Sequence, residues 1–264
     1  MLKQGTNFFL IILHVLFNKV LESHQWPWGK SNLVIFLRKP GKESYTEAGA
    51  YRPITISSHV GKTLERILEN RLRTLTESQL ILPKNQFGFR KGRGTNMYLL
   101  QLLAELTHQL KAKAHTAAIF LDLQKAFDTV WHQGMILRLK ELGISGNFLH
   151  VIHSFLTTRF INLKVNGYTH PAKICTTGLP QGSVLSPLLF IIYTRDMLSE
   201  IVGTGLQYAD DCTVLVTGKD STELQKICQS NCTKIQQWIN TWKLKVNYQK
   251  TKWYHFMVNS YHQP

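Results

Sequence analysis

Asp210 and Asp211 form the pair of side chains with the clearest chemical potential in this sequence. They stand between two runs with strand character, residues 206–208 and the apolar, β-branched residues 212–216, so the pair marks a predicted hairpin turn. Aspartate is a common turn residue because its carboxylate binds nearby backbone amides, and that role alone could explain the pair. The alternative is a divalent-cation site, because Mg²⁺ prefers a few carboxylate oxygens together with water and substrate phosphate.

Asp122 is the candidate third acid. It lies within residues 117–123, an apolar run that predicts a strand, where an unpaired charge is costly. Its partner could be one of the many Lys and Arg side chains, or a cation shared with Asp210 and Asp211. Three carboxylates from two segments would suit phosphoryl transfer with two metal ions about 3.5–4 Å apart, one activating a 3′-hydroxyl and the other holding a triphosphate.

The composition bounds the size and the partners of the protein. Its 264 residues are 44% hydrophobic, enough for one large domain or two small ones. Lys and Arg number 31 against 16 Asp and Glu, so the net charge is +15. This excess favours a polyanionic partner, either nucleic acid or an anionic membrane surface.

Several classes of protein are disfavoured by the same inspection. The four cysteines include no Cys-x-x-Cys pair, which disfavours a zinc site. Their fraction is too low for a disulfide scaffold, so a reducing compartment fits best. Residues 8–17 form the longest apolar run, which is too short to span a bilayer and has no cleavage site after it. We interpret this run as a core helix and expect no membrane segment.

The elements that must position the acids alternate between strands and helices. We expect strands at residues 33–37, 51–55, 117–123, 160–165, 172–175, 206–208, 212–216 and, as short pieces, 245–257. We expect helices at residues 61–75, 95–113, 135–142, 147–156, 186–201 and 221–242. The apolar stripe of the first of these six helices is Leu64, Ile67, Leu68, Leu72 and Leu75, and the expected buried face of the second is Leu99, Leu102, Leu103, Leu106 and Leu110.

Six motifs in family order resemble those of the reverse transcriptases of non-LTR retrotransposons, especially the jockey-like elements. Residues 120–130 (FLDLQKAFDTV) resemble the first catalytic motif, 178–187 (GLPQGSVLSP) the nucleotide-pocket motif, and 208–211 (YADD) the polymerase signature. Residues 238–252 resemble the motif that follows the polymerase signature in the family, and residues 51–54 and 86–90 resemble the fingers motifs.

The resemblance implies an α+β fold with the fingers and palm of a right-hand polymerase. The fingers would comprise residues 1–113 and 136–177, and the palm residues 114–135 and 178–264, within one reverse transcriptase domain. The palm would be a split-βαβ antiparallel sheet backed by helices. On this resemblance we expect the thumb and the upstream endonuclease to be absent from the chain.

The resemblance also implies roles for the acids and for the nucleotide pocket. Asp122 and Asp210 would be the main ligands of two Mg²⁺ ions, with Asp211 supporting and Mn²⁺ a possible substitute. Phe127 would exclude a 2′-hydroxyl, or would be an ordinary core residue. Gln181 and Gly182 would line the pocket, or would form a plain turn.

Basic residues receive roles in the same way. Arg52 and Lys62 would contact the triphosphate, because an arginine fork binds phosphate bidentately, although Lys62 could belong to a solvated face. Lys250 would protonate or screen pyrophosphate, or would be a surface lysine. The residues expected at the nucleic acid are Arg90, Lys91 and Arg93 on template phosphates and Tyr208 at the primer end.

The implied function is an RNA-directed DNA polymerase that uses an RNA template, a DNA primer and deoxynucleoside triphosphates. The alternative is a catalytically incompetent remnant that only binds nucleic acid. An intracellular location, in the cytoplasm or the nucleus, would accompany either function. The sequence makes no prediction of the oligomeric state.

Overall fold

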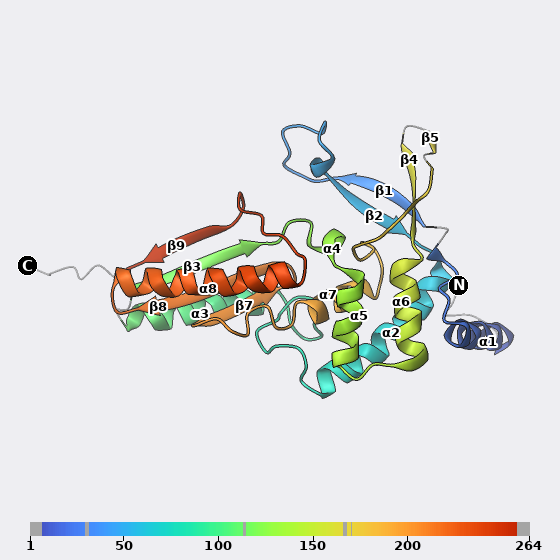
Figure 1. Ribbon diagram of the computed structural model, residues 1–264, viewed down its shortest axis with the longest axis horizontal. Helices are drawn as coiled ribbons and strands as arrows, with labels where there is room; N and C mark the ends of the chain where they lie inside the picture. The colour runs from blue at the N-terminus through green and yellow to red at the C-terminus, as the bar shows by residue number, and fades with distance from the viewer. Residues whose placement is uncertain (1–6, 30–31, 113–114, 166–167, 170, 258–264) are drawn as a thin grey trace, which may run out of the picture. The chain divides into compact units, whose positions relative to one another are not determined.

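The apolar strand β3 (His115–Asp122) ends in the predicted acid and lies inside a four-stranded antiparallel sheet. The computed structural model describes residues 7–29, 32–112, 115–165, 168–169 and 171–257 (Figure 1). Its contacts divide the chain into two compact units, each made of two segments: Met1–Thr74 with Trp131–Ser186, and Leu75–Val130 with Pro187–Pro264. The combination of helices with one antiparallel sheet and one mixed sheet, in which β1 and β4 are parallel, confirms the predicted α+β class.

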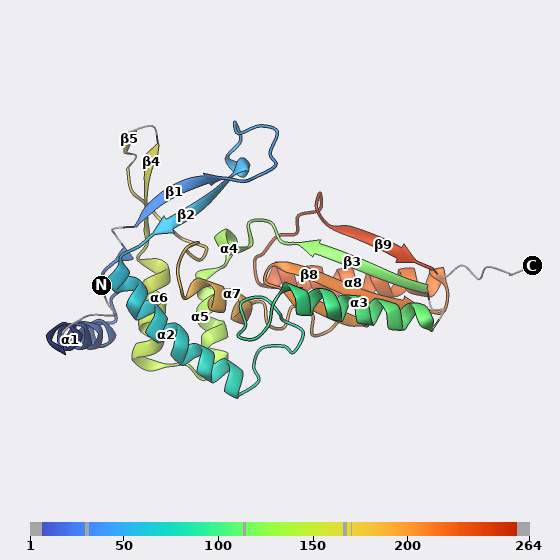
Figure 2. The same cartoon turned by 180° about the vertical axis from the view of Figure 1, so that it is seen from behind.

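The second unit contains the acid-bearing sheet, in the strand order β7-β8-β3-β9. The three further strands are β7 (Thr204–Tyr208), β8 (Asp211–Gly218) and β9 (Lys252–Phe256). α3 (Thr95–Lys111) covers one face of the sheet and α8 (Ser221–Thr241) covers the other, as Figures 1 and 2 show from opposite sides. α8 begins where the Asp220 carboxylate accepts two 2.8 Å hydrogen bonds from the first-turn amides of Thr222 and Glu223, a standard N-cap.

Two shorter helices complete the second unit. α4 (Ala126–Thr129) follows β3 directly, and α7 (Ser186–Tyr193) has six consecutive buried residues, 188–193. The prediction that the second of these helices continues to residue 201 was wrong. After Tyr193 the chain continues in turns, with Met197 N bonded to Thr194 O and Ser199 N to Asp196 O.

The first unit contains a smaller sheet in the order β2-β1-β4-β5, with β6 paired to β4. Its strands are β1 (Leu33–Arg38), β2 (Tyr51–Ile56), β4 (Phe160–Val165), β5 (Tyr168–Thr169) and β6 (Lys173–Ile174), and a 3-10 turn, η3 (Ala48–Ala50), precedes β2. Its helices are α1 (Asn7–Ser23), most of α2 (His59–Ser78), α5 (His132–Glu141) and α6 (Gly146–Thr157). The expected pairing of residues 160–165 with 172–175 is confirmed by β4 and β6, while residues 166–167 lie outside the described residues.

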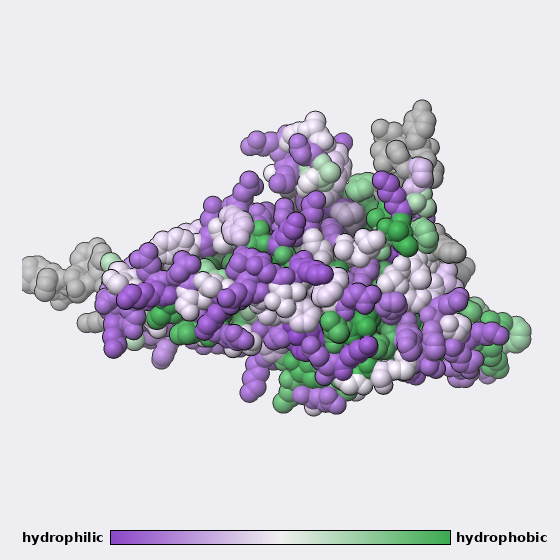
Figure 3. Space-filling view, in the orientation of Figure 1, coloured by the Kyte–Doolittle hydropathy of each residue, from purple (hydrophilic) through white to green (hydrophobic). Residues whose placement is uncertain are grey.

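The interpretation of residues 8–17 as a core helix was wrong in its burial, although the helix exists. In α1 the buried side chains are Leu13, Phe17 and Val20, a single stripe, and α1 makes its main contacts with α6. The apolar side chains on the remaining surface face solvent (Figure 3), and they are Phe8, Leu10, Ile11, Ile12, Val15 and Leu16. In the described ranges no helix is long and apolar enough to cross a membrane.

α3 differs from its prediction in two respects. None of its side chains is fully buried, and Leu99 and Leu103 are 56% and 61% exposed, because a helix on one face of a sheet presents only one side to it. α3 also belongs with the acid-bearing sheet, since the hydroxyl oxygens of Tyr98 and Thr213 lie 2.5 Å apart. Residues up to Thr74 belong to the first unit and α3 to the second, and the assignment of residues 1–113 to the fingers stays a prediction. In α2, Leu64, Leu68 and Leu72 of the expected stripe are buried, whereas Ile67 is exposed and Leu75 is half-buried.

Candidate active site

The register of the acid-bearing sheet brings the three predicted acids together at one end of its two central strands, β3 and β8. Asp122, the last residue of β3, is the direct cross-strand partner of Asp211, the first residue of β8. Directly opposite residues in an antiparallel ladder have Cβ atoms roughly 4.5–5.5 Å apart. Asp210 stands beside them in the two-residue turn between Tyr208 and Asp211, which are themselves partners in the β7–β8 hairpin. The two distant segments therefore meet, as the cation hypothesis requires.

The electrostatics of Asp211 reflect this crowding. Its pKa is raised above the ordinary value, first by partial burial and then by the negative charges of Asp210 and Asp122. The nearby Lys250 ammonium acts in the opposite direction and lowers the pKa of Asp211. Carboxylates that repel one another in this way form a site at which a cation is favourable.

Asp122 is oriented by the loop that follows α8. The side-chain amide of Asn247 donates a 2.8 Å hydrogen bond to Oδ2 of Asp122, and the ammonium of Lys250 lies 3.6 Å from the same oxygen. The hydroxyl of Thr251 accepts from the backbone amide of Asp122 at 3.5 Å. The Lys250 contact corresponds to the predicted salt bridge, but the Lys250 side chain is 65% exposed, so this pair contributes little energy.

The donor set fits a hard cation. Carboxylate oxygens are the ligands that Mg²⁺ prefers, and one or two of them suffice when substrate phosphate and water supply the rest. In the described part of the chain no three His, Cys, Asp or Glu side chains are arranged to enclose an ion by themselves. A cation at Asp122 and Asp211 would need further oxygen ligands besides these two carboxylates.

Phe127 lies close to the acids in sequence, in α4. Its ring stacks on Phe190 of α7 with centroids 4.7 Å apart and planes at 17°, and Phe89 meets it edge-on at 6.0 Å. The Phe190 side chain is fully buried, so the Phe127 ring has a rigid support and is half-buried itself. The Phe127 ring is thus held in place by two aromatic neighbours.

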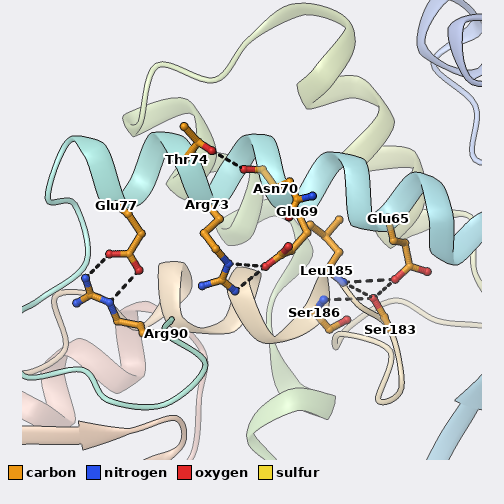
Figure 4. Close-up of polar contacts among 10 residues, drawn as sticks. All are labelled: Glu65, Glu69, Asn70, Arg73, Thr74, Glu77, Arg90, Ser183, Leu185 and Ser186. Carbon is orange, nitrogen blue, oxygen red and sulfur yellow. Dashed lines mark hydrogen bonds and ion pairs between the residues drawn. The ribbon is translucent and has the colours of Figure 1, made fainter. Parts of the chain in front are cut away.

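The pocket motif lies in the first unit, where a buried acid of α2 holds it. Oε2 of Glu65 accepts hydrogen bonds from Ser183 Oγ at 2.5 Å and from the amide nitrogen of Leu185 at 3.4 Å (Figure 4). It also accepts from the amide nitrogen of Val184 at 2.7 Å. Burial raises the pKa of Glu65, although these hydrogen bonds and the charge of Lys62 act to lower it. The sequence analysis missed Glu65, whose signal was an acid directly beside the buried stripe at Leu64.

The two predicted pocket residues are fixed to β2. The carbonyl of Gln181 accepts from the Thr55 amide at 2.7 Å. Gly182 has a φ of +101°, and a Cβ there would lie 2.7 Å from the Thr55 carbonyl oxygen, so this position requires glycine. Arg52, on β2, is exposed, and Lys62, on α2, is half-buried. These four predicted residues belong to the first unit, whereas the three acids belong to the second.

The predicted template-binding residues differ from one another. Arg90 is 6% exposed at its side chain and forms an ion pair with Glu77 (Figure 4). It also donates to the Pro83 carbonyl at 2.8 Å. This geometry favours a structural role for Arg90 over the expected phosphate contact. Arg93 donates to the carbonyls of Lys84 and Gln86.

Of the remaining predicted nucleic-acid residues, Lys91 extends into solvent and Tyr208 packs against a ring. Lys91 is exposed, so its ammonium is accessible to a phosphate. The half-buried ring of Tyr208 lies 6.0 Å from that of Tyr98.

Relatives of this chain are known from mobile elements. Residues 37–263 match the family described as reverse transcriptase (RNA-dependent DNA polymerase). The chain is 34% identical over 251 residues to the RNA-directed DNA polymerase from mobile element jockey of Drosophila melanogaster, an alignment that covers 91% of this chain and 27% of the relative. It is also 34% identical over 253 residues to the probable RNA-directed DNA polymerase from transposon BS of the same species, covering 92% and 28%. The chain thus spans little more than a quarter of the length of these relatives.

Solved telomerase structures share the fold. Apo telomerase from Candida tropicalis, truncated from its C-terminal domain, superposes with a TM-score of 0.64 at 15% identity, covering 95% of this chain and 56% of that one. Telomerase from Candida albicans in complex with the TWJ fragment of telomeric RNA superposes with a TM-score of 0.65 at 13% identity, covering 92% and 43%. These likenesses confirm the predicted polymerase fold, and the relatives confirm the resemblance of the motifs.

Proposed function

Because this chain belongs to the reverse transcriptase (RNA-dependent DNA polymerase) family and is a reverse transcriptase domain of a non-LTR retrotransposon, we propose that its three acids serve deoxynucleotide transfer to a primer 3′-hydroxyl. The template would be RNA and the primer DNA. The observation that carries the proposal is the cross-strand pairing of Asp122 with Asp211, beside Asp210 in the hairpin turn. Segments distant in the sequence thereby provide carboxylates at the same end of the sheet.

The chemistry requires divalent cations, for which Mg²⁺ is the expected ion and Mn²⁺ a substitute. When bound, two such ions supply activation of the primer hydroxyl and neutralisation of the triphosphate. Asp122 and Asp210 would hold them, with Asp211 in support. Asn247 fixes the orientation of the Asp122 carboxylate, so that less reorganisation is needed when the cation arrives.

Other residues of the chain would bind and select the substrate. Phe127, supported by the stacked ring of Phe190, would contact the sugar and leave no room for a 2′-hydroxyl. Gln181 and Gly182 would line the nucleotide pocket, on a loop that Glu65 holds in place. Arg52 and Lys62 would contact the triphosphate as cations, and Lys250 would stand close to the leaving pyrophosphate.

Primer extension tests this function. The protein is incubated with an RNA template, an annealed DNA primer, deoxynucleotides and Mg²⁺, and extension is compared among the wild type, Asp122→Asn, Asp210→Asn and Asp220→Asn. Asp220→Asn is the matched control, because asparagine caps a helix about as well as aspartate and α8 therefore remains intact. We expect extension by the wild type and the control and none by the other two variants. Extension that survives Asp210→Asn would reject the proposed mechanism.

The net charge of +15 favours a second candidate function, which is binding of nucleic acid without turnover. This function predicts that primer–template binds in a salt-dependent way, equally well to wild type and Asp210→Asn, while no extension occurs with either. Fluorescence anisotropy of a labelled primer–template at several KCl concentrations separates the two functions.

A further inference from the structure

The turn that carries Asp210 has an unfavourable backbone conformation. Ala209 has a φ of +59°, in the left-handed region that residues with a Cβ seldom occupy. Such a conformation persists when neighbouring groups hold it, and it is often found at functional sites. Ala209 is also buried, with 5% of its surface exposed, so a protein group must bind its backbone amide.

That group is the side chain of Gln86. Its Oε1 accepts two hydrogen bonds, from the Ala209 amide at 3.1 Å and from the Gly88 amide at 2.9 Å. Backbone amides can only donate, so the orientation of the carboxamide is determined. The Gln86 side chain is fully buried, and the structure shows no hydrogen-bond partner for its Nε2 among the described residues. This carboxamide therefore binds the turn at one atom, and its other polar atom remains unsatisfied.

The backbone around Gln86 is built to bring it there. Gln86 forms an isolated parallel β-bridge with Gln207 of β7, with Phe87 N bonded to Gln207 O at 2.8 Å and Gln207 N to Asn85 O at 2.9 Å. At the next residue, Gly88, a Cβ would clash with the amide nitrogen of Ala209, so only glycine permits the approach. The segment and the turn are thus in direct contact at the position where the turn is strained.

We propose that Gln86 is a positioning residue that holds the Ala209–Asp210 turn and thereby places the carboxylates of Asp210 and Asp211. The catalytic part of this inference rests on the proposed function, but the structural part does not. Gln86 touches neither substrate nor cation, and it acts through the turn.

The test compares Gln86→Met with Gln207→Met and Gln86→Glu. Methionine keeps the length of the side chain and removes the acceptor. Gln207 is a matched control, since it is 3% exposed, lies on the neighbouring strand and points its amide at Thr194 O and Cys212 Sγ rather than at the turn. Glutamate at position 86 retains an oxygen that can accept from both amides and should rescue the turn.

Hydrogen–deuterium exchange of the peptide covering residues 206–212 is the first readout, and it does not depend on polymerase activity. We expect exchange roughly fivefold or more faster in Gln86→Met, as for a lost hydrogen bond, and near wild-type exchange in Gln207→Met and Gln86→Glu. Melting temperatures identify any variant that fails to fold, in which case the Gln86→Glu comparison alone decides. Unchanged exchange in Gln86→Met, or equal acceleration in Gln207→Met, overturns the proposal.

The second readout is Mn²⁺ binding followed by electron paramagnetic resonance, together with primer extension. Displacement of the turn should weaken Mn²⁺ binding in Gln86→Met and lower kcat roughly 10–100-fold, with the KM for deoxynucleotide unchanged. An equal loss in Gln207→Met would show a merely structural role and overturn the catalytic part. If the wild type itself fails to extend primers, the proposed function is rejected, whereas the exchange and Mn²⁺ measurements still decide the role of Gln86.

Discussion

Asn247 and Asp122 are joined by two hydrogen bonds of the same length. The backbone amide of Asn247 donates to the carbonyl of Asp122 at 2.8 Å, and its side-chain amide donates to Oδ2 at 2.8 Å. The first bond fixes the loop after α8 against the end of β3, and the second fixes the carboxylate. A residue 125 positions away in the sequence thus determines where Asp122 points.

The side-chain bond predicts the effect of Asn247→Ala. Without its donor the Asp122 carboxylate can rotate, and we expect Mn²⁺ affinity and extension rate to fall about 10–100-fold, as for other groups that orient metal ligands. Asn240→Ala is the control, because Asn240 lies on α8 and its side chain accepts from Gln236, away from the acids. Titration with Mn²⁺ monitored by paramagnetic resonance measures the change. An affinity equal to that of the Asn240→Ala variant would mean that the bond does not orient the ligand.

Lys250 is expected to lower the pH at which cation binding is lost on acidification. Its charge lowers the pKa of Asp211, so Lys250→Met should raise that pKa further above the ordinary value. Since a cation binds the deprotonated carboxylate, the pH at which Mn²⁺ binding is lost should move upward in this variant. The shift should shrink as KCl is added, because Lys250 is largely exposed and its field is screened. Lys245→Met, which removes an exposed lysine of the same loop, should leave the pH profile unchanged.

The meeting of the three acids could be predicted from the sequence, whereas the polar residues that hold the site's loops could not, for a physical reason. Asp122, Asp210 and Asp211 stand at the ends of apolar strands, and the alternation of such strands determines which residues meet across the sheet. Gln86 and Glu65 are buried polar residues, and each accepts a hydrogen bond from a backbone amide more than 100 positions away, which no local pattern indicates.

The burial of helices was the other weak point. The apolar residues 8–17 were expected in a core, but one stripe of α1 meets α6 and the rest is exposed, since hydropathy does not reveal how many neighbours a helix has. For the same reason the prediction that Leu99 and Leu103 of α3 are buried was wrong. Strand register is constrained by period-two alternation, whereas the number of layers around a helix is set by the whole fold.

Glu65 predicts a pH dependence of stability in the first unit. Its pKa is raised in the folded protein from an ordinary value of 4.5, so between these two values the folded state binds more protons than the unfolded chain. The free energy of unfolding should therefore decrease as pH rises through this interval and then level off. Glu65→Gln should remove this contribution while retaining an oxygen for Ser183 and Val184.

Urea unfolding at several pH values between 4 and 7 measures the effect of Glu65. Glu69→Gln is the control, because Glu69 lies one turn along α2 and is paired with Arg73, and this variant should keep the slope that Glu65 causes. Parallel pH dependences in the wild type and Glu65→Gln would contradict the assignment.

Arg90 and Lys91 are adjacent, and the structure predicts opposite consequences for their removal. Lys91 is exposed, so Lys91→Ala should leave stability unchanged and lower the salt dependence of primer–template binding, with the slope of log K against log [salt] falling by about 1. Arg90→Ala leaves Glu77 without its ion-pair partner and the Pro83 carbonyl without a donor, and should cost on the order of 2 kcal/mol of stability because the Arg90 side chain is buried. Anisotropy titrations between 50 and about 300 mM KCl and urea unfolding separate the two effects. A normal salt slope in Lys91→Ala together with a reduced slope in a fully stable Arg90→Ala would restore Arg90, and not Lys91, as the template contact.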